Sequence, residues 1–309
     1  MLTVHRCWLV LILAAIHTVS AAVPKAPAWA AKAIPVLAAR ADANSLATAA
    51  ALSAADSLQT ALELAARASE LAPQSAAIGW LRLQLCIRSQ TCAIRDIATN
   101  MRWVDPDNAA AWLPTLAAAQ RDRDTTEVDR ILADMARTPR FDLYWNHIVV
   151  LMFDALGSAR GALPGASEFS RYAAVSDIAK GEIIPIFAPL VDACRESSAL
   201  PERRDLCLKI SKLMQRGDTI AAQLVGFTIE RRLLAPDSKE ARTIAERRHV
   251  LEWRVAAAAK LDVALLPWTK NARARARIAQ MRAVPREEDV CIAILRKHKM
   301  ALEPPEERR

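Results

Sequence analysis

Glycine is scarce in this chain of 309 residues, which contains seven glycines and is rich in alanine. Tight turns between strands rely on glycine, so its scarcity argues against a sheet-rich fold. Alanine is the residue with the highest helix propensity. After the N-terminal segment, no apolar run is long enough to cross a bilayer as a helix. The composition therefore predicts an all-α protein.

The chain also lacks the short motifs that mark common catalytic sites. It has no Gly-x-Ser-x-Gly turn, no glycine-rich phosphate loop followed by lysine and no His-Glu-x-x-His motif. Close Cys-x-x-Cys or His-x-x-x-His spacing is missing too, so we expect neither a metal site nor a cofactor. Residues distant in sequence can still assemble a site, so these absences do not exclude catalysis.

The first 22 residues have the pattern of a secretory signal peptide. Arg6 supplies a positive charge, an apolar run follows from Cys7 to Ile16, and Ser20-Ala21-Ala22 offers small residues for cleavage. The apolar run is too short to span a bilayer, although an uncleaved anchor helix is the alternative. This pattern predicts a periplasmic or secreted protein.

Prolines recur at an even interval in the first half of the chain. Pro73, Pro106 and Pro139 are separated by 33 residues each. Three tryptophans follow at nearly the same spacing: Trp80, Trp112 and Trp145. A period near 33 residues is typical of stacked helical hairpins, because one hairpin cannot bury its apolar face alone.

Apolar residues repeat in the same register on the expected second helices of these hairpins. The pattern i, i+3, i+4, i+7 places them on one helix face. Three sets show it: Ala61, Leu64, Ala65 and Ala68; Ile94, Ile97, Ala98 and Met101; Val128, Ile131, Leu132 and Met135. The sequence thus predicts antiparallel helical hairpins over residues 41–156.

Two segments carry a family resemblance, VDPDNAAAWL at 104–113 and RTPRFDLYW at 137–145, in which tryptophan follows proline by six residues. Here the chain resembles tetratricopeptide-like repeats. The resemblance implies a right-handed stack of antiparallel helical hairpins, an α-solenoid, that usually binds proteins or peptides. Leu83 and Leu116 stand where the family has glycine in the first helix, so these repeats are degenerate.

The remaining chain is expected to be mostly helical. Residues 23–40 are a linker or capping helix, and 157–165, with spaced glycines, are a loop. A C-terminal helical region follows over 166–301, and the tail over 302–309 is expected to be disordered.

Start and stop signals divide the C-terminal helical region. Pro201 opens a helix that is expected to end near Gly217, and Asp218 is expected to cap the next helix. Asp237 followed by Glu240 resembles a capping box at the start of a long helix. Two shorter helices are expected near 270–282 and 287–301.

Five cysteines remain beyond the signal segment. Cys86 and Cys92 flank one predicted turn symmetrically, and Cys194 and Cys207 flank another. Symmetry about a turn places two side chains opposite each other on facing helices, as disulfide geometry requires. The sequence predicts two disulfides, each within one hairpin. Cys291 is left either buried or paired with a second chain.

Charge is uneven along the chain. Residues 23–194 carry 16 Lys and Arg against 18 Asp and Glu, whereas residues 195–309 carry 25 against 16. The basic half suggests weak contact with an anionic envelope surface, and a solvated helical surface is the alternative. The arginines near 273–282 are spaced by two, which scatters charge around a helix, so we expect no nucleic-acid partner.

Two hypotheses of function follow. The first is a non-enzymatic exported scaffold or adaptor that binds an unknown protein or peptide partner in the cell envelope, with Trp80, Trp112 and Trp145 as candidate binding residues. Core packing between hairpins is the alternative role for these tryptophans.

The second hypothesis is a cell-envelope enzyme acting on cell-wall polymer, with its site between the two halves. His147, Glu182 and His249 are its candidate residues, chosen by chemical type alone.

Overall fold

The computed structural model describes residues 28–163, 165–196, 200–263 and 267–305. All regular elements in these ranges are helices, and an isolated bridge joins Asn108 to Arg140. The all-α prediction is confirmed. The predicted signal peptide, residues 1–22, lies outside the described residues.

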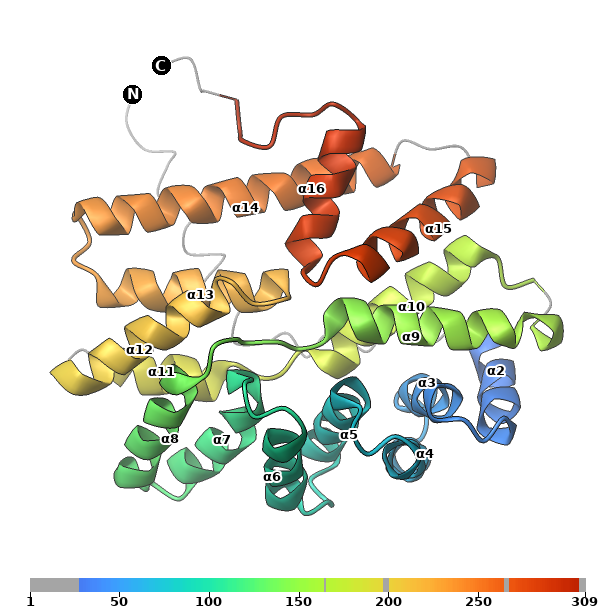
Figure 1. Cartoon of the computed structure of the whole chain (residues 1–309), viewed down its shortest axis with the longest axis horizontal. Helices are drawn as coiled ribbons and strands as arrows, with labels where there is room; N and C mark the ends of the chain where they lie inside the picture. Colours follow the sequence, from blue (N-terminus) through green and yellow to red (C-terminus); the bar gives the residue numbers. More distant parts are fainter. Residues whose placement is uncertain (1–27, 164, 197–199, 264–266, 306–309) are drawn as a thin grey trace, which may run out of the picture.

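Three antiparallel hairpins, preceded by α2, form the N-terminal part (Figure 1). They pair α3 with α4, α5 with α6 and α7 with α8. The helices are α2 (Ala28–Ala39), α3 (Ala43–Ser53), α4 (Leu58–Leu71), α5 (Ala76–Ser89), α6 (Ile94–Val104), the short η1 (Ala109–Trp112), α7 (Leu113–Arg121) and α8 (Thr125–Arg137).

The repeated apolar residues face the inside of these hairpins. All four members of the sets on α4 and α8 are buried, as are Ala98 and Met101 on α6. Side-chain caps set the helix starts, as Ser75 Oγ accepts the backbone N–H of Ile78 at 3.4 Å.

The chain leaves the row of hairpins after α8. Residues 138–144 have no helix, and Tyr144 has a left-handed backbone with φ of 60°. Helix α9 (Trp145–Ser158) then packs against α3, α10 (Glu168–Ile183) and α15 (Pro267–Ala283), while α12 (Pro201–Met214) lies beside α8 (Figure 1). The third proline–tryptophan segment, Pro139 to Trp145, therefore does not continue the row of hairpins onto α8.

The remaining helices complete the C-terminal part, where α13 packs on α12 and α14, and α15 packs on α9 and α10. They are α11 (Ala188–Glu196), α12 (Pro201–Met214), α13 (Ile220–Leu233), α14 (Lys239–Val263), α15 (Pro267–Ala283) and α16 (Glu287–Lys297). One large hydrophobic cluster extends from α2 to α16, so the two parts share a core. Within the described ranges, no helix is both long and apolar enough to cross a bilayer.

Both predicted disulfides are present. Cys86 is joined to Cys92 across 5.4 Å between Cα atoms, and Cys194 to Cys207 across 5.6 Å. The first closes the turn between α5 and α6, and the second joins α11 to α12. Cys291 is half-buried and belongs to neither bond.

Several predicted helix ends need correction. Thr219, rather than Asp218, caps α13 by accepting the N–H of Ala222 at 3.1 Å. At α14, Ser238 accepts the N–H of Ala241 at 3.0 Å, so the start does not use Asp237 as a capping box would. The expected loop at 157–165 contains a short helix, η2 (Arg160–Ala162), and α16 ends at Lys297.

Candidate functional site

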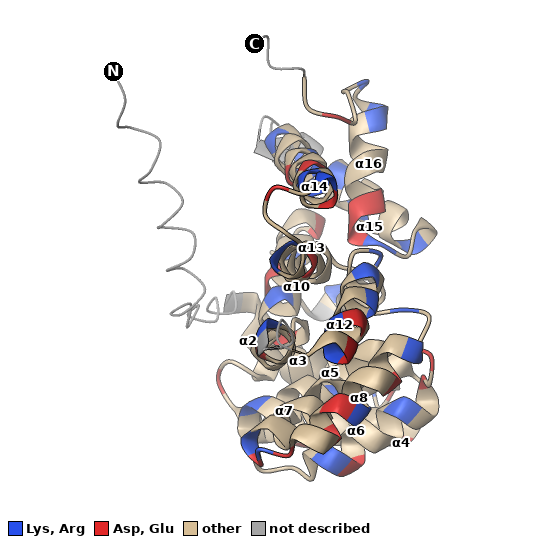
Figure 2. Ribbon diagram, turned by 90° about the vertical axis from the view of Figure 1, so that its left-hand side faces the viewer, with Lys and Arg blue, Asp and Glu red and all other residues tan. Residues whose placement is uncertain are grey.

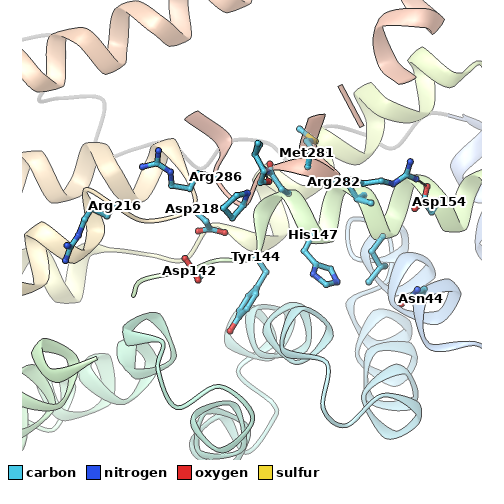
Figure 3. Close-up of a pocket in the computed structure, with 16 residues that line it drawn as sticks. Asn44, Asp142, Tyr144, His147, Asp154, Arg216, Asp218, Met281, Arg282 and Arg286 are labelled. Atoms are coloured by element: carbon cyan, nitrogen blue, oxygen red, sulfur yellow. Dashed lines mark hydrogen bonds and ion pairs between the residues drawn. The ribbon is translucent and has the colours of Figure 1, made fainter. Parts of the chain in front are cut away.

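An open cleft of about 870 Å³ lies beside α9 (Figure 3). One wall is the face of α9 that carries His147, Val150 and Leu151, and residues 281–286, which join α15 to α16, form the other. The turn between α12 and α13 contributes Arg216 and Asp218. With Asn44 from the start of α3, the cleft thus gathers side chains from four separate parts of the sequence.

Asp218 is the central buried acid of this cleft. Its Oδ1 accepts the backbone N–H of Leu143 at 2.7 Å, and its Oδ2 accepts that of Trp145 at 3.0 Å. The carboxylate therefore caps α9, whose first amides have no partner within the helix. Burial raises the pKa of Asp218 to about 7, and the nearby carboxylates of Asp142 and Glu287 add to the rise.

Glu287 ties the same region to α16. Its carboxylate accepts the backbone N–H of Ile220 at 2.9 Å, at the start of α13. Its own backbone N–H donates to the carbonyl oxygen of Asp218 at 2.8 Å. Burial raises the pKa of Glu287 as well. Two acids thus hold the starts of α9 and α13 against the α15–α16 segment.

Asn146 lines the cleft from the first turn of α9 and is almost fully buried. Its Nδ2 donates to the carbonyl oxygen of Val284 at 2.9 Å. Its Oδ1 is buried and has no hydrogen-bond partner among the described residues. Buried polar atoms are normally paired, so this oxygen marks a place where a bound donor would be favourable.

A polar network supports the cleft on the side of the hairpins. The Tyr144 hydroxyl donates to Asp105, which also pairs with Arg140. Arg140 pairs with Asp142 at 2.6 Å, and the amide of Asn108 donates to the Tyr144 hydroxyl at 2.9 Å. Burial and the bond to Asp105 raise the pKa of Tyr144. Asp142 therefore shares an arginine with Asp105, whereas Asp218 is held by backbone amides.

Arginines and a histidine form the rim of the cleft. Arg282 pairs with Asp154, and Figure 3 shows the two side chains meeting at one end of the cleft. Arg286 pairs with Asp289 at 2.6 Å, while Arg216 and His147 are exposed. Two of the three rim arginines are thus offset by acids.

The predicted tryptophans lie outside this cleft. Trp80 is fully buried and donates its indole N–H to Ile183 at 3.0 Å, and Trp145 is also buried. Trp112 is half-buried, and the guanidinium of Arg102 lies 4.4 Å from its ring centroid. Burial favours core packing for Trp80 and Trp145 and leaves part of the Trp112 ring accessible.

The three candidate catalytic residues do not come together. Only His147 lines the cleft. Glu182 is buried and forms an ion pair with Arg88 at 2.5 Å, and His249 is exposed on α14. Among the described residues, no group of three or more His, Cys, Asp or Glu could hold a metal ion.

Acidic and basic residues alternate along the C-terminal helices (Figure 2). Arg248 pairs with Glu252 at 2.7 Å along α14, and Arg254 pairs with Glu288 at 2.7 Å between α14 and α16. This pairing favours a solvated helical surface for much of the basic half.

Comparisons with family models, curated proteins and solved structures find no match for this chain. The cleft beside α9 is therefore interpreted from its own geometry. The sequence pattern predicted that Asp218 caps α13, whereas it caps α9. The pattern did not predict Asn146 and Arg216 as residues of a site. For Asn146 and Arg216 no local pattern distinguishes the residues from other polar positions on helices and turns.

Proposed function

We propose that this protein is an exported, non-enzymatic helical adaptor that binds a protein or peptide partner in the cell envelope through the cleft beside α9. The observation that carries the proposal is an open cleft with a buried, unpaired acceptor in its wall, at Asn146 Oδ1. Ligand sites are concave and combine apolar surface with a few placed polar groups. Val150, Leu151 and Met281 supply the apolar part.

Export is supported by the two disulfides and by the signal-like first 22 residues. Disulfides form and persist in oxidising compartments and are rare in the cytosol of most cells. The first bond closes the hairpin of α5 and α6, and the second joins the consecutive helices α11 and α12, so each stabilises the local fold. The three hairpins from α3 to α8 support the tetratricopeptide-like interpretation, as degenerate repeats.

The cleft, rather than the face of the hairpins, is the proposed binding surface. Helices α9 and α10 pack against α3 and α5 and cover part of the first two hairpins. Trp80 is buried there against the end of α10. The accessible surface over this part of the hairpins is therefore formed by α9 and α10, and the cleft lies beside α9.

A site-specific photo-crosslinker tests this proposal in intact cells. A photoreactive amino acid replaces His147, which is exposed in the cleft, or His249, which is exposed on α14 outside it. We expect a discrete envelope protein crosslinked from position 147 and not from position 249. Equal crosslinking from both positions, or none from position 147, would contradict the adaptor function at this cleft.

A secondary proposal concerns the basic half. Residues 195–309 would contact an anionic envelope surface weakly, because basic residues outnumber acidic ones there, 25 to 16. Flotation with anionic and neutral liposomes tests it. Binding that does not depend on lipid charge would rule this contact out.

A second candidate function is a cell-envelope enzyme acting on cell-wall polymer. One observation favours it: Asp218, with a pKa of about 7, lines the same cleft as His147. The test is release of soluble fragments from purified cell-wall polymer by the mature chain. This function requires release that is lost in His147→Gln and retained in His249→Gln.

A further inference from the structure

Buried side chains of the cleft beside α9 present acceptors rather than donors. Asn146 is 2% exposed, and its Nδ2 is committed to the carbonyl oxygen of Val284. Its Oδ1 has no partner within the described part of the chain. Leaving such an oxygen buried and unpaired costs free energy, because it has lost its hydrogen bonds to water. A donor brought by a ligand would remove this cost.

Asp218 adds a buried carboxylate to the same cleft. It is 5% exposed, and its side-chain hydrogen bonds in the described residues come from the backbone amides of Leu143 and Trp145. The neighbouring charges that act on it are the carboxylates of Asp142 and Glu287. A buried anion is normally paired with a cation, and no ion pair to Asp218 is present among the described residues.

The cleft also has apolar surface beside these acceptors. Val150 and Leu151 on α9 face the cleft together with Met281 on α15. Lysine and arginine side chains bury an apolar stem while their charged ends reach polar groups. The cleft therefore has surfaces for both parts of such a side chain.

We infer that the cleft binds the ammonium or guanidinium group of a basic residue of the partner, which donates to Asn146 Oδ1 and to the Asp218 carboxylate. This inference rests on the proposed adaptor function and adds the chemistry of recognition. Of the three rim arginines, Arg282 and Arg286 are offset by Asp154 and Asp289. The third, Arg216, is exposed, so solvent and salt screen its charge. Metal binding does not suit the donor set, which includes no group of three ligating side chains in the described ranges.

Binding of the cation is expected to depend on pH. In the unbound protein, burial raises the pKa of Asp218 to about 7, so its carboxyl is partly protonated at neutral pH. A bound cation favours the ionised form, so affinity rises as the pH increases through 7. The titratable and charged groups around Asp218 are Asp142, Tyr144, His147, Arg216, Arg286 and Glu287.

NMR titration of the full mature chain with small probes tests the inference. The probes are the N-acetyl methylamides of lysine, arginine, norleucine and glutamate, of which norleucine has the apolar stem of lysine without its charge. We expect the lysine and arginine probes to shift the signals of Asn146 and Asp218. The norleucine probe is expected to bind at least about tenfold more weakly, because it lacks the charged group that donates a hydrogen bond to the cleft.

A matched pair of variants locates the charge. Asp218→Asn is expected to weaken binding of the lysine probe about tenfold. Asp237→Asn makes the same chemical change at an exposed position outside the cleft and should leave binding unchanged. Thermal unfolding checks that both variants fold. If Asp218→Asn does not fold, the comparison of the four probes on the unaltered chain decides whether the cleft binds a cation.

Three results would overturn the inference: equal binding of lysine and norleucine probes, tighter binding of the glutamate probe, or no binding of the basic probes. Crosslinking from position 147 without a preference for basic probes would leave the adaptor function standing and remove the cation site. Binding of basic probes without any crosslinked protein would support the cation site and contradict the adaptor function.

Discussion

The Asp218 carboxylate lies 3.0 Å from the backbone nitrogen of Trp145 and caps α9 from a turn 73 residues later in the chain. The same carboxylate accepts the N–H of Leu143 at 2.7 Å. This contact holds the C-terminal part of the chain against the start of α9, in one wall of the cleft. Because it is buried, its protonation is linked to the stability of the fold.

Stability is predicted to fall as the pH rises from about 4 to 7. The pKa of Asp218 is about 7 in the folded chain, above its ordinary value of 3.8, so the folded state binds the additional proton in this range. The stabilisation is fully present below pH 4 and is lost above pH 7. The free energy of unfolding falls between these limits by on the order of 4 kcal/mol at most. Glu287 acts in the same direction. Urea unfolding across this range should show the decline.

The matched variant for this pH dependence is Asp218→Asn, which cannot ionise. Its free energy of unfolding should change less with pH between 4 and 7 than that of the unaltered chain. Parallel pH profiles for the two proteins would show that Asp218 is not the responsible group.

Gly226→Ala is predicted to destabilise the packing of α12 against α13. A Cβ at Gly226 would lie 2.7 Å from the carbonyl oxygen of Ser211 and 2.9 Å from the backbone nitrogen of Gln215. Backbone atoms cannot move aside as side chains can, so we expect a loss of about 2 kcal/mol or more in unfolding free energy. Thermal and urea unfolding measure it.

Gly181→Ala is the control for Gly226→Ala. Gly181 is in α10, and a Cβ there meets nothing within 4 Å. Alanine has a higher helix propensity than glycine, so this variant should be more stable by about 0.5 to 1 kcal/mol. Equal effects of the two substitutions would contradict the close approach of α12 and α13.

The two disulfides are predicted to differ in their contribution to stability. Cys194–Cys207 spans 13 residues and Cys86–Cys92 spans 6. A longer loop loses more entropy on closure, so we expect about 3 kcal/mol for the first and slightly more than 2 kcal/mol for the second. Urea unfolding of the two double Cys→Ala variants tests this order. Under a reductant, both variants should match the reduced unaltered chain.

Removal of Arg88 is predicted to destabilise the contact between α5 and α10. Arg88 pairs with the buried Glu182 at 2.5 Å and donates to the carbonyl oxygen of Ala54 at 2.5 Å. Burial already raises the pKa of Glu182, and Arg88 opposes that rise. Arg88→Met leaves the acid unpaired, with an expected loss of about 3 kcal/mol at pH 7.

A double variant separates the buried charge from the lost packing. Arg88→Met with Glu182→Gln removes both charges and should be more stable than Arg88→Met alone. The difference should shrink at low pH, where the unpaired Glu182 is protonated. A double variant as unstable as the single one at neutral pH would show that the charge is not the cause.

Local sequence patterns were sufficient to predict the helices and the two disulfides. Apolar residues at i, i+3, i+4 and i+7 select one helix face from interactions within two turns, and Val128, Ile131 and Met135 are buried as that pattern predicts. Cys86 lies in the last turn of α5 and Cys92 in the loop before α6, so the reversal of the chain between them explains the correct pairing of Cys86 with Cys92. Both features depend on residues close in sequence.

The path of α9 and the composition of the cleft depend on contacts between helices that are far apart in the sequence. Asp218 and Thr219 are adjacent, and both are residue types that cap helices. Local patterns therefore cannot show which of them caps α13 and whether the other caps a distant helix. The choice is made by the packing of α9 against α15 and by the turn that brings Asp218 to Leu143, 75 residues earlier. Such contacts depend on how whole helices pack, and the local sequence does not encode their partners.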